Sequence, residues 1–160
     1  MTSSPCSLPL APDQGLIILN CSRSKLDTTA PIPALDLYQG ACVPQCREHF
    51  AAVPTRRARI RILSAAHGLL RPDEQISTYD RRLTTRTDAL RLHERTVAEQ
   101  LDTELANTPA LQHLLIIVEP LYLLALQSMF DHLNRLHIAI VPDPRAWRDG
   151  RAHLRRWGWA

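Results

Sequence analysis

GLIILNCSRSK, residues 15–25, sets the pattern that decides the fold. Its first part, Gly15–Asn20, is a short apolar run that predicts a buried strand. Its second part, Cys21–Lys25, is polar and predicts a loop at the carboxyl end of that strand. Three later runs have the same strand-forming character: residues 59–64, 113–118 and 136–141. We therefore expect four strands separated by longer segments.

Helical segments alternate with these strands. Apolar periodicity and well-placed prolines predict helices at residues 34–39, 44–52, 87–107, 120–132 and 147–157. Such alternation is typical of a parallel sheet that helices cover on both sides. We therefore predict a small, doubly wound α/β domain with a mainly parallel four-stranded sheet and helices on both faces. Residues 65–83 are predicted to form a long loop, and such loops usually carry function.

The composition fits a single domain. The chain has 160 residues, of which 45% are hydrophobic and 22% charged, which excludes a disordered protein. No apolar run approaches about 20 residues, so we expect no membrane-spanning segment and no membrane partner. We interpret residues 1–14 as a flexible lead-in without a secretion signal and residues 15–160 as one domain, and therefore expect a cytoplasmic protein. The net charge of +3 permits an anionic partner without requiring one.

Lys25 is distinctive because it is the only lysine in the sequence. The other eighteen of the nineteen basic residues are arginine. Lysine offers a compact point charge and an amine whose pKa can be tuned, and arginine offers neither. We therefore interpret Lys25 as a residue with a specific role. The alternative is that a single lysine remains in this sequence by chance.

The four cysteines do not predict disulfides or a metal site. A cytoplasmic chain keeps its thiols reduced. The spacing of Cys42, Cys46 and His49 is poor for zinc. These three positions share one face of a helix, so we interpret them as small core residues and predict no metal and no cofactor.

Ligands of doubly wound sheets bind at the carboxyl ends of the strands. This rule selects the loop after the first strand, whose hydroxyl, guanidinium, ammonium and amide groups match a phosphate or a carboxylate. The predicted anion- or nucleotide-binding residues of this loop are Cys21, Ser22, Arg23 and Ser24. An exposed polar turn is the alternative interpretation.

Further binding residues are predicted after the second strand and among the tyrosines. Ser64, His67 and Gly68 follow that strand, where Gly68 would let the backbone turn tightly near a ligand that His67 contacts. A Ser–His nucleophile pair is the alternative, although the GxSxG pattern is absent. Tyr38 and Tyr79 are predicted to frame a base or sugar, whereas buried tyrosines with satisfied hydroxyls are at least as common.

Lys25 and two carboxylates are the predicted catalytic residues. Asp80 belongs to the long loop, and Glu119 lies between a strand end and Pro120. Cleavage of a glycosidic bond needs a carboxylate near the anomeric carbon or the leaving group. The alternative for Glu119 is electrostatic stabilisation of the helix that Pro120 begins.

Several short motifs together resemble a known family. They are Cys21-Ser-x-x-Lys25, Leu37-Tyr38-x-Gly40, Leu63-Ser64-Ala65-x-x-Gly68-Leu69 and Tyr79-Asp80-x-x-Leu83, with Tyr122 further along. The combination is similar to small bacterial and phage proteins of unknown function that are related to the YaaA peroxide-stress proteins. It covers residues 16–83 well and departs at 118–121, where the family usually has small residues. The resemblance implies an α/β domain connected with nucleotides or nucleic acid.

Residues and resemblance together favour a nucleotide- or nucleic-acid-processing enzyme that cleaves or transfers at an N-glycosidic bond. A non-catalytic DNA-binding module of a stress response is the first alternative. A secondary-metabolism enzyme that acts on a small anionic metabolite is the second. The oligomeric state stays open.

Overall fold

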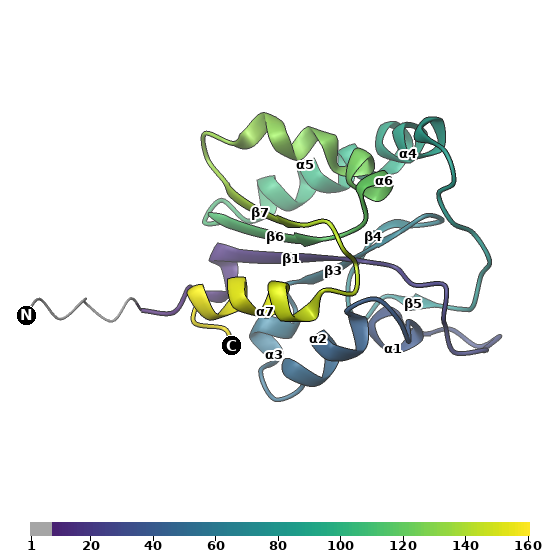
Figure 1. The fold of residues 1–160 in the computed structure, drawn as a ribbon, viewed down its shortest axis with the longest axis horizontal. Coiled ribbons are helices and arrows are strands. Elements are labelled where there is room, and N and C mark those ends of the chain that lie inside the picture. Colours follow the sequence, from purple (N-terminus) through teal and green to yellow (C-terminus); the bar gives the residue numbers. More distant parts are fainter. Residues whose placement is uncertain (1–7) are drawn as a thin grey trace, which may run out of the picture.

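A computed structural model describes residues 8–160 as an α/β fold around a five-stranded sheet (Figure 1). The sheet has the order β4-β3-β1-β6-β7. Its strands are β1 (Gly15–Asn20), β3 (Ile60–Ser64), β4 (Gly68–Leu70), β6 (His113–Ile117) and β7 (His137–Val141). Neighbouring strands run parallel except β3 and β4, which are antiparallel. The predicted fold class and all four predicted strands are confirmed.

The fifth strand corrects the predicted count of four. It lies within residues 65–83, which we predicted to be a loop, and has only three residues. A tight turn with Gly68 at φ +70° brings the chain straight back against β3. The same predicted loop contains β5 (Gln75–Ile76), which pairs with β2 (Ile32–Pro33) in a separate two-stranded sheet.

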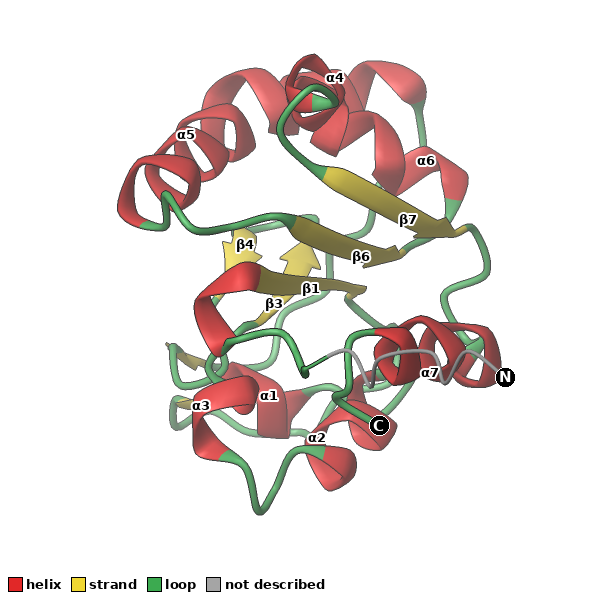
Figure 2. Ribbon diagram, turned by 90° about the vertical axis from the view of Figure 1, so that its left-hand side faces the viewer, coloured by secondary structure: helices red, strands yellow, loops and turns green. Residues whose placement is uncertain are grey.

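Helices cover both faces of the sheet, as predicted (Figures 1 and 2). One face carries α1 (Ala34–Leu37), α2 (Val43–His49), α3 (Pro54–Arg57) and α7 (Trp147–Arg156). The other carries α4 (Arg86–Leu92), a π-helical turn (His93–Val97), α5 (Ala98–Asn107), and α6 (Pro120–Leu123) with its 3₁₀ continuation (Leu124–His132). A short 3₁₀ turn (Pro12–Gln14) precedes β1. No helix within residues 8–160 is long and apolar enough to span a membrane.

The central strand β1 lies entirely inside the core, because helices cover both of its faces and strands flank both of its edges. Cys42 and Cys46 are fully buried in and beside α2, so their interpretation as core residues is confirmed. Burial raises the pKa of the Cys42 thiol to about 12 and that of Cys46 well above its usual value. Both thiols therefore stay protonated and apolar.

The two ends of the described chain meet at the amino end of the sheet. The Leu10 amide donates to the Trp157 carbonyl at 2.9 Å, and the Trp159 indole donates to the Leu10 carbonyl at 2.9 Å. The described part of the predicted lead-in is thus attached to the carboxyl-terminal segment. Residues 1–7 of that prediction, which include Cys6, lie outside the described residues.

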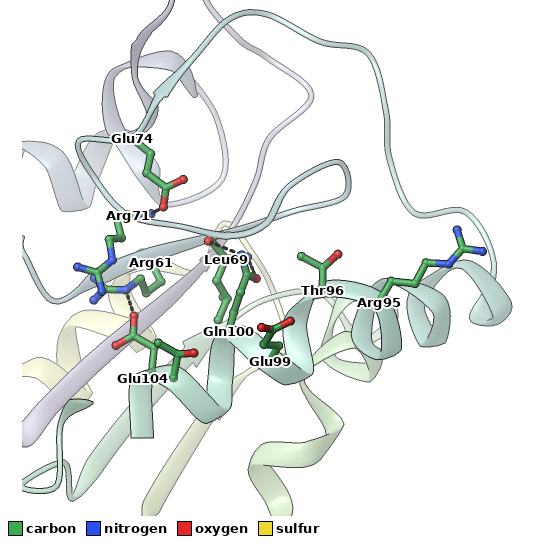
Figure 3. Close-up of a pocket in the computed structure, with 10 residues that line it drawn as sticks. Arg61, Leu69, Arg71, Glu74, Arg95, Thr96, Glu99, Gln100 and Glu104 are labelled. Atoms are coloured by element: carbon green, nitrogen blue, oxygen red, sulfur yellow. Dashed lines mark hydrogen bonds and ion pairs between the residues drawn. The ribbon is translucent and has the colours of Figure 1, made fainter. Parts of the chain in front are cut away.

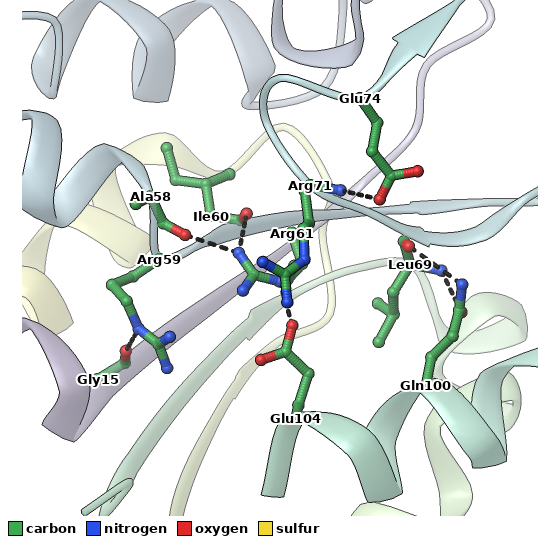
Figure 4. Close-up of polar contacts among 10 residues, drawn as sticks. All are labelled: Gly15, Ala58, Arg59, Ile60, Arg61, Leu69, Arg71, Glu74, Gln100 and Glu104. Atoms are coloured by element: carbon green, nitrogen blue, oxygen red, sulfur yellow. Dashed lines mark hydrogen bonds and ion pairs between the residues drawn. The ribbon is translucent and has the colours of Figure 1, made fainter. Parts of the chain in front are cut away.

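An ion pair is buried between β3 and α5. The Arg61 guanidinium donates to the Glu104 carboxylate, and the two side chains are 3% and 9% exposed (Figure 3). Arg61 also donates to the carbonyls of Ala58 and Ile60 at 2.7 and 2.9 Å (Figure 4). Removing one member of such a pair leaves an uncompensated buried charge.

We therefore expect Glu104→Ala to lower the free energy of unfolding by about 3–5 kcal/mol. The double variant Arg61→Met/Glu104→Leu should regain most of that loss, because apolar groups of similar size replace both charges. Urea denaturation of the two variants measures the difference. A single variant that unfolds like the wild type would show that water already solvates this pair.

Two histidines stack at the amino ends of β6 and β7. The rings of His113 and His137 lie with centres 5.0 Å apart, and the Trp157 ring centre is 6.0 Å from His113. Partial burial and the neighbouring His137 lower the pKa of His113 below its usual value of 6.5. The folded state therefore favours the neutral form of His113.

Acidification through the histidine range is expected to destabilise the fold. Below pH 6.5 the unfolded chain protonates His113, whereas the folded chain does so only at a lower pH, so stability falls as the pH falls. Thermal unfolding between about pH 5.5 and 7.5 measures this loss, which His113→Gln should reduce. The same pH dependence in wild type and variant would contradict the role of this histidine.

Candidate functional site

The strand order creates a crevice at one edge of the sheet. The chain passes from β1 to β3 on one side, and β6 then adds on the other side of β1. The loops after β1 and β6 therefore leave toward opposite faces, and ligands of open α/β sheets bind between such loops. A cavity of about 490 Å³ lies there. Its lining residues are Asn20, Cys21, Ser22, Arg23, Ser24, Lys25, Gly40, Ala41, Asp80, Arg81, Arg82, Glu119, Tyr122, Pro144 and Arg145.

Asn20 connects the two loops that form this cavity. Its amide oxygen accepts from the Glu119 backbone amide at 3.0 Å, and its amide nitrogen donates to the Cys21 carbonyl at 2.9 Å. The side chain is 4% exposed, so both bonds are shielded from water. Asn20 therefore fixes the position at which Glu119 leaves β6.

The loop after β1 is closed by Ser22. The Ser22 hydroxyl donates its proton to the Ser24 carbonyl at 2.6 Å and accepts from the Gly40 amide at 3.1 Å. A Cβ on Gly40 would lie 3.0 Å from the Ser22 Cβ, so a larger residue would fit here only if Ser22 shifted by a few tenths of an ångström. Ser22 thus shapes the predicted anion loop, whereas the exposed Ser24 and Arg23 can donate to a ligand.

Lys25 lies at the cavity wall over two tyrosine rings. Its Nζ atom is 4.7 Å from the ring centre of Tyr79 and 5.9 Å from that of Tyr38. A cation at this distance is attracted to the faces of aromatic rings. Lys25 forms no ion pair with any carboxylate of residues 8–160, and its only hydrogen bond is a 3.5 Å contact with the Arg23 carbonyl. Its ammonium group is therefore held in place and still available to an anion.

The tyrosines predicted to frame a base are instead bonded to each other. The hydroxyls of Tyr38 and Tyr79 are 2.5 Å apart, and that of Tyr79 is 2.6 Å from Ser64 Oγ. Tyr38 is fully buried and none of the three lines the cavity, so stacking of a base on Tyr38 is excluded in this conformation. Burial raises the pKa of Tyr38 to about 12 and raises that of Tyr79 further. These uncharged, hydrogen-bonded tyrosines form the surface on which the Lys25 ammonium group lies.

His67 and Gly68 lie outside the cavity as well. His67 is exposed, and its ring packs edge-to-face on Tyr79 with centres 5.1 Å apart. Ser64 Oγ accepts from the backbone amide of His67 at 3.2 Å, so the structure shows no Ser–His nucleophile pair. Gly68 does turn the chain tightly, as predicted, but the groups that crowd it belong to Gln100 and Thr96.

Cys21 lines the cavity in a protonated form. Its thiol donates to the Tyr122 hydroxyl at 3.6 Å, and that hydroxyl accepts from the Leu83 amide at 3.2 Å. Burial is the largest cause that raises the pKa of Cys21, and it also raises the pKa of Tyr122. Cys21 is thus a neutral wall group, not a thiolate nucleophile.

The charged lining is dominated by cations. It contains Arg23, Lys25, Arg81, Arg82 and Arg145 against Asp80 and Glu119. None of these seven side chains forms an ion pair with another charged side chain of residues 8–160. In the same range no group of three or more histidines, cysteines or carboxylates is arranged to hold a metal. The cavity therefore presents unpaired charges of both signs, with positive charge in excess.

The structure brings together most of the predicted residues and adds several that sequence reasoning missed. Lys25, Asp80 and Glu119 share the cavity with the predicted loop Cys21–Ser24. The additions are Asn20, Gly40, Ala41, Arg81, Arg82, Tyr122, Pro144 and Arg145. Asn20, a polar residue at the end of an apolar strand, was the available signal. The arginines could not be identified as site residues from the sequence, because exposed arginines are common.

Another cavity, of about 330 Å³, lies between β4 and α5 (Figure 3). Its charges are balanced, with three arginines and three glutamates, and the Arg61–Glu104 pair is among them. Gln100 Oε1 accepts from the Leu69 amide at 2.7 Å and Gln100 Nε2 donates to the Leu69 carbonyl at 3.2 Å (Figure 4). Arg61, Glu74, Gln100 and Glu104 are already bonded to other groups of this cavity, so we assign it a structural role.

The sequence matches a known protein family. The profile of a family of unknown function (DUF6884) matches residues 16–137. This range includes the cavity-lining residues from Asn20 to Tyr122 but not Arg145. No curated protein and no solved structure matches the chain.

Asn20→Ala should release the loop after β6. The Glu119 amide would lose its buried acceptor, which costs about 1–3 kcal/mol of stability. Hydrogen exchange should show faster exchange at that amide. Ser128→Ala is the matched control, since the buried Ser128 hydroxyl has no partner among residues 8–160. Unchanged exchange at Glu119 would show that other contacts hold the loop.

Proposed function

The chain belongs to this family of unknown function, and we propose from its site that it is an enzyme that acts at the N-glycosidic bond of a nucleotide, free or within nucleic acid. The resemblance of its motifs to YaaA-related proteins supports a connection with nucleotides. We also propose that it works in the cytoplasm, where such substrates are found.

One observation carries this proposal, namely the coexistence of unpaired cations and unpaired carboxylates in one cavity. Lys25 and Arg23 can neutralise a phosphate, and Asp80 and Glu119 remain free to act on another part of the same ligand. The volume of about 490 Å³ suits a ligand of nucleotide size. A pocket for a simple anion would not need the carboxylates.

The phosphate is assigned to the loop after β1. Lys25 supplies an ammonium group over the tyrosine rings, Arg23 an exposed guanidinium, and Ser24 a hydroxyl. Charge-assisted hydrogen bonds of this kind are about twice as strong as neutral ones. The sugar would then face the carboxylates.

Asp80 and Glu119 are assigned to the reacting centre. Breaking an N-glycosidic bond develops positive charge at the anomeric carbon, which a nearby carboxylate stabilises. In hydrolysis, a water oxygen bonds to that carbon, and the water gives a proton to a carboxylate. The base leaves with the electron pair of the broken C–N bond and is then protonated. Which of Asp80 and Glu119 accepts the proton is a question for the variants below.

The test measures, by chromatography, the release of free base from nucleoside monophosphates, nucleosides and DNA. We expect release from at least one phosphorylated substrate. Asp80→Asn or Glu119→Gln should slow it about 10²–10⁴-fold, as loss of an acid–base group does. Lys25→Ala should mainly raise KM, because the phosphate is bound before and during the reaction.

Glu99→Gln is the matched control, because Glu99 lines the structural cavity beside α5. Base release that is equally slow in this control and in Glu119→Gln would remove the catalytic assignment. No release from any substrate would overturn the enzyme proposal. Salt-sensitive affinity for duplex DNA that survives loss of both carboxylates would favour the DNA-binding alternative. Saturable binding of a different small anion without DNA binding would favour the metabolic one.

A further inference from the structure

A smaller cavity adjoins the candidate site at the carboxyl end of β3. Its volume is about 170 Å³, and Arg81 lines both it and the larger cavity. The lining residues are Ala65, Ala66, Arg81, Leu83, Asp88, Arg91, Leu92, Arg95 and Thr96. The segment that contains Arg81 thus separates two adjacent hollows along one edge of the sheet.

The smaller cavity is also cationic. Three guanidinium groups, those of Arg81, Arg91 and Arg95, face a single carboxylate, Asp88. Within residues 8–160 the three arginine side chains form no ion pair and no hydrogen bond. Asp88 itself accepts a hydrogen bond from Thr84 at 3.3 Å. The three cations of this cavity therefore outnumber its one carboxylate, and none of them is paired with it.

Helix geometry holds two of these cations together. Arg91 lies in α4 and Arg95 in the π-helical turn His93–Val97 that continues it. Both side chains line the smaller cavity, so their like charges repel each other there, and a bound anion would relieve that repulsion. In Figure 3 the Arg95 side chain extends away from the buried Arg61–Glu104 pair. Arg95 also lines the structural cavity of about 330 Å³ that contains Glu99, but it forms no ion pair with any carboxylate of residues 8–160.

The charge distribution of the whole chain agrees with this location. The two adjoining cavities contain seven of the nineteen basic residues and three of the sixteen acidic ones, a net charge of +4. The remaining twelve basic and thirteen acidic residues give −1. The excess positive charge of the molecule is therefore gathered at these two hollows. Such a concentration attracts a ligand with several separated negative charges.

We propose that the smaller cavity is a second phosphate subsite and that the substrate is consequently an oligonucleotide strand. This inference rests on the proposed function of the larger cavity. A mononucleotide carries its phosphate at one end of the sugar and fills only the larger cavity. A strand carries a phosphate at every sugar, so one phosphate reaches Lys25 while its neighbour reaches Arg91 and Arg95.

Equilibrium binding of three probes tests the inference: a nucleoside monophosphate, a nucleoside triphosphate and a labelled single strand of about eight nucleotides. The strand should bind at least about tenfold more tightly than the monophosphate. Arg91→Ala/Arg95→Ala should remove this advantage and leave monophosphate binding unchanged. Loss of the contact with one phosphate should also reduce the slope of log affinity against log salt by about 0.7.

Arg151→Ala/Arg155→Ala is the matched control, because these exposed arginines of α7 are also four residues apart. An equal loss in this control would indicate general electrostatic attraction and overturn the inference. Unchanged strand binding in Arg91→Ala/Arg95→Ala would overturn it too, as would tighter binding of the triphosphate than of the strand. Absence of monophosphate binding to the wild type would instead overturn the proposed function itself.

Discussion

The reversal of strand order at β1 determines where this protein can bind a ligand. Because β3 and β6 flank β1 on opposite sides, the loops after β1 and β6 diverge and leave a hollow that backbone cannot fill. Asn20 lies at the point of divergence and joins the two loops through both ends of its amide. The cavity therefore lies at the strand ends, and one buried side chain connects the loop of Lys25 with that of Glu119.

The parallel strands could be predicted because each is an apolar run bounded by polar residues, and the alternation with helices implied their topology. The short elements β2, β4 and β5 could not be predicted in the same way. Strands of two or three residues have no measurable periodicity, and they form only because neighbouring segments present free backbone groups. Gly68 was the one local signal for β4, but the tight turn that it permits was predicted to lie near a ligand instead.

The candidate site was predicted in part for a related reason. The strand-end rule selected Lys25 and Glu119 because it depends on topology alone. It also selected Ser64 and His67, and with Tyr38 and Tyr79 they form a wall behind the cavity. A sequence shows that a hydroxyl is present but not whether another side chain already satisfies it. Conversely, Arg145 follows the last strand and lines the cavity. No local sequence pattern distinguishes it from the other exposed arginines.

The Gln100 side chain affects whether a further strand can pair with the edge strand β4. By bonding to both the amide and the carbonyl of Leu69, this side chain takes the place that a sixth strand would occupy beside β4. Open sheet edges are templates on which further chains can add, and proteins that lack a cover there tend to aggregate. One amide group thus occupies the backbone donor and acceptor of Leu69 through which a further strand would pair.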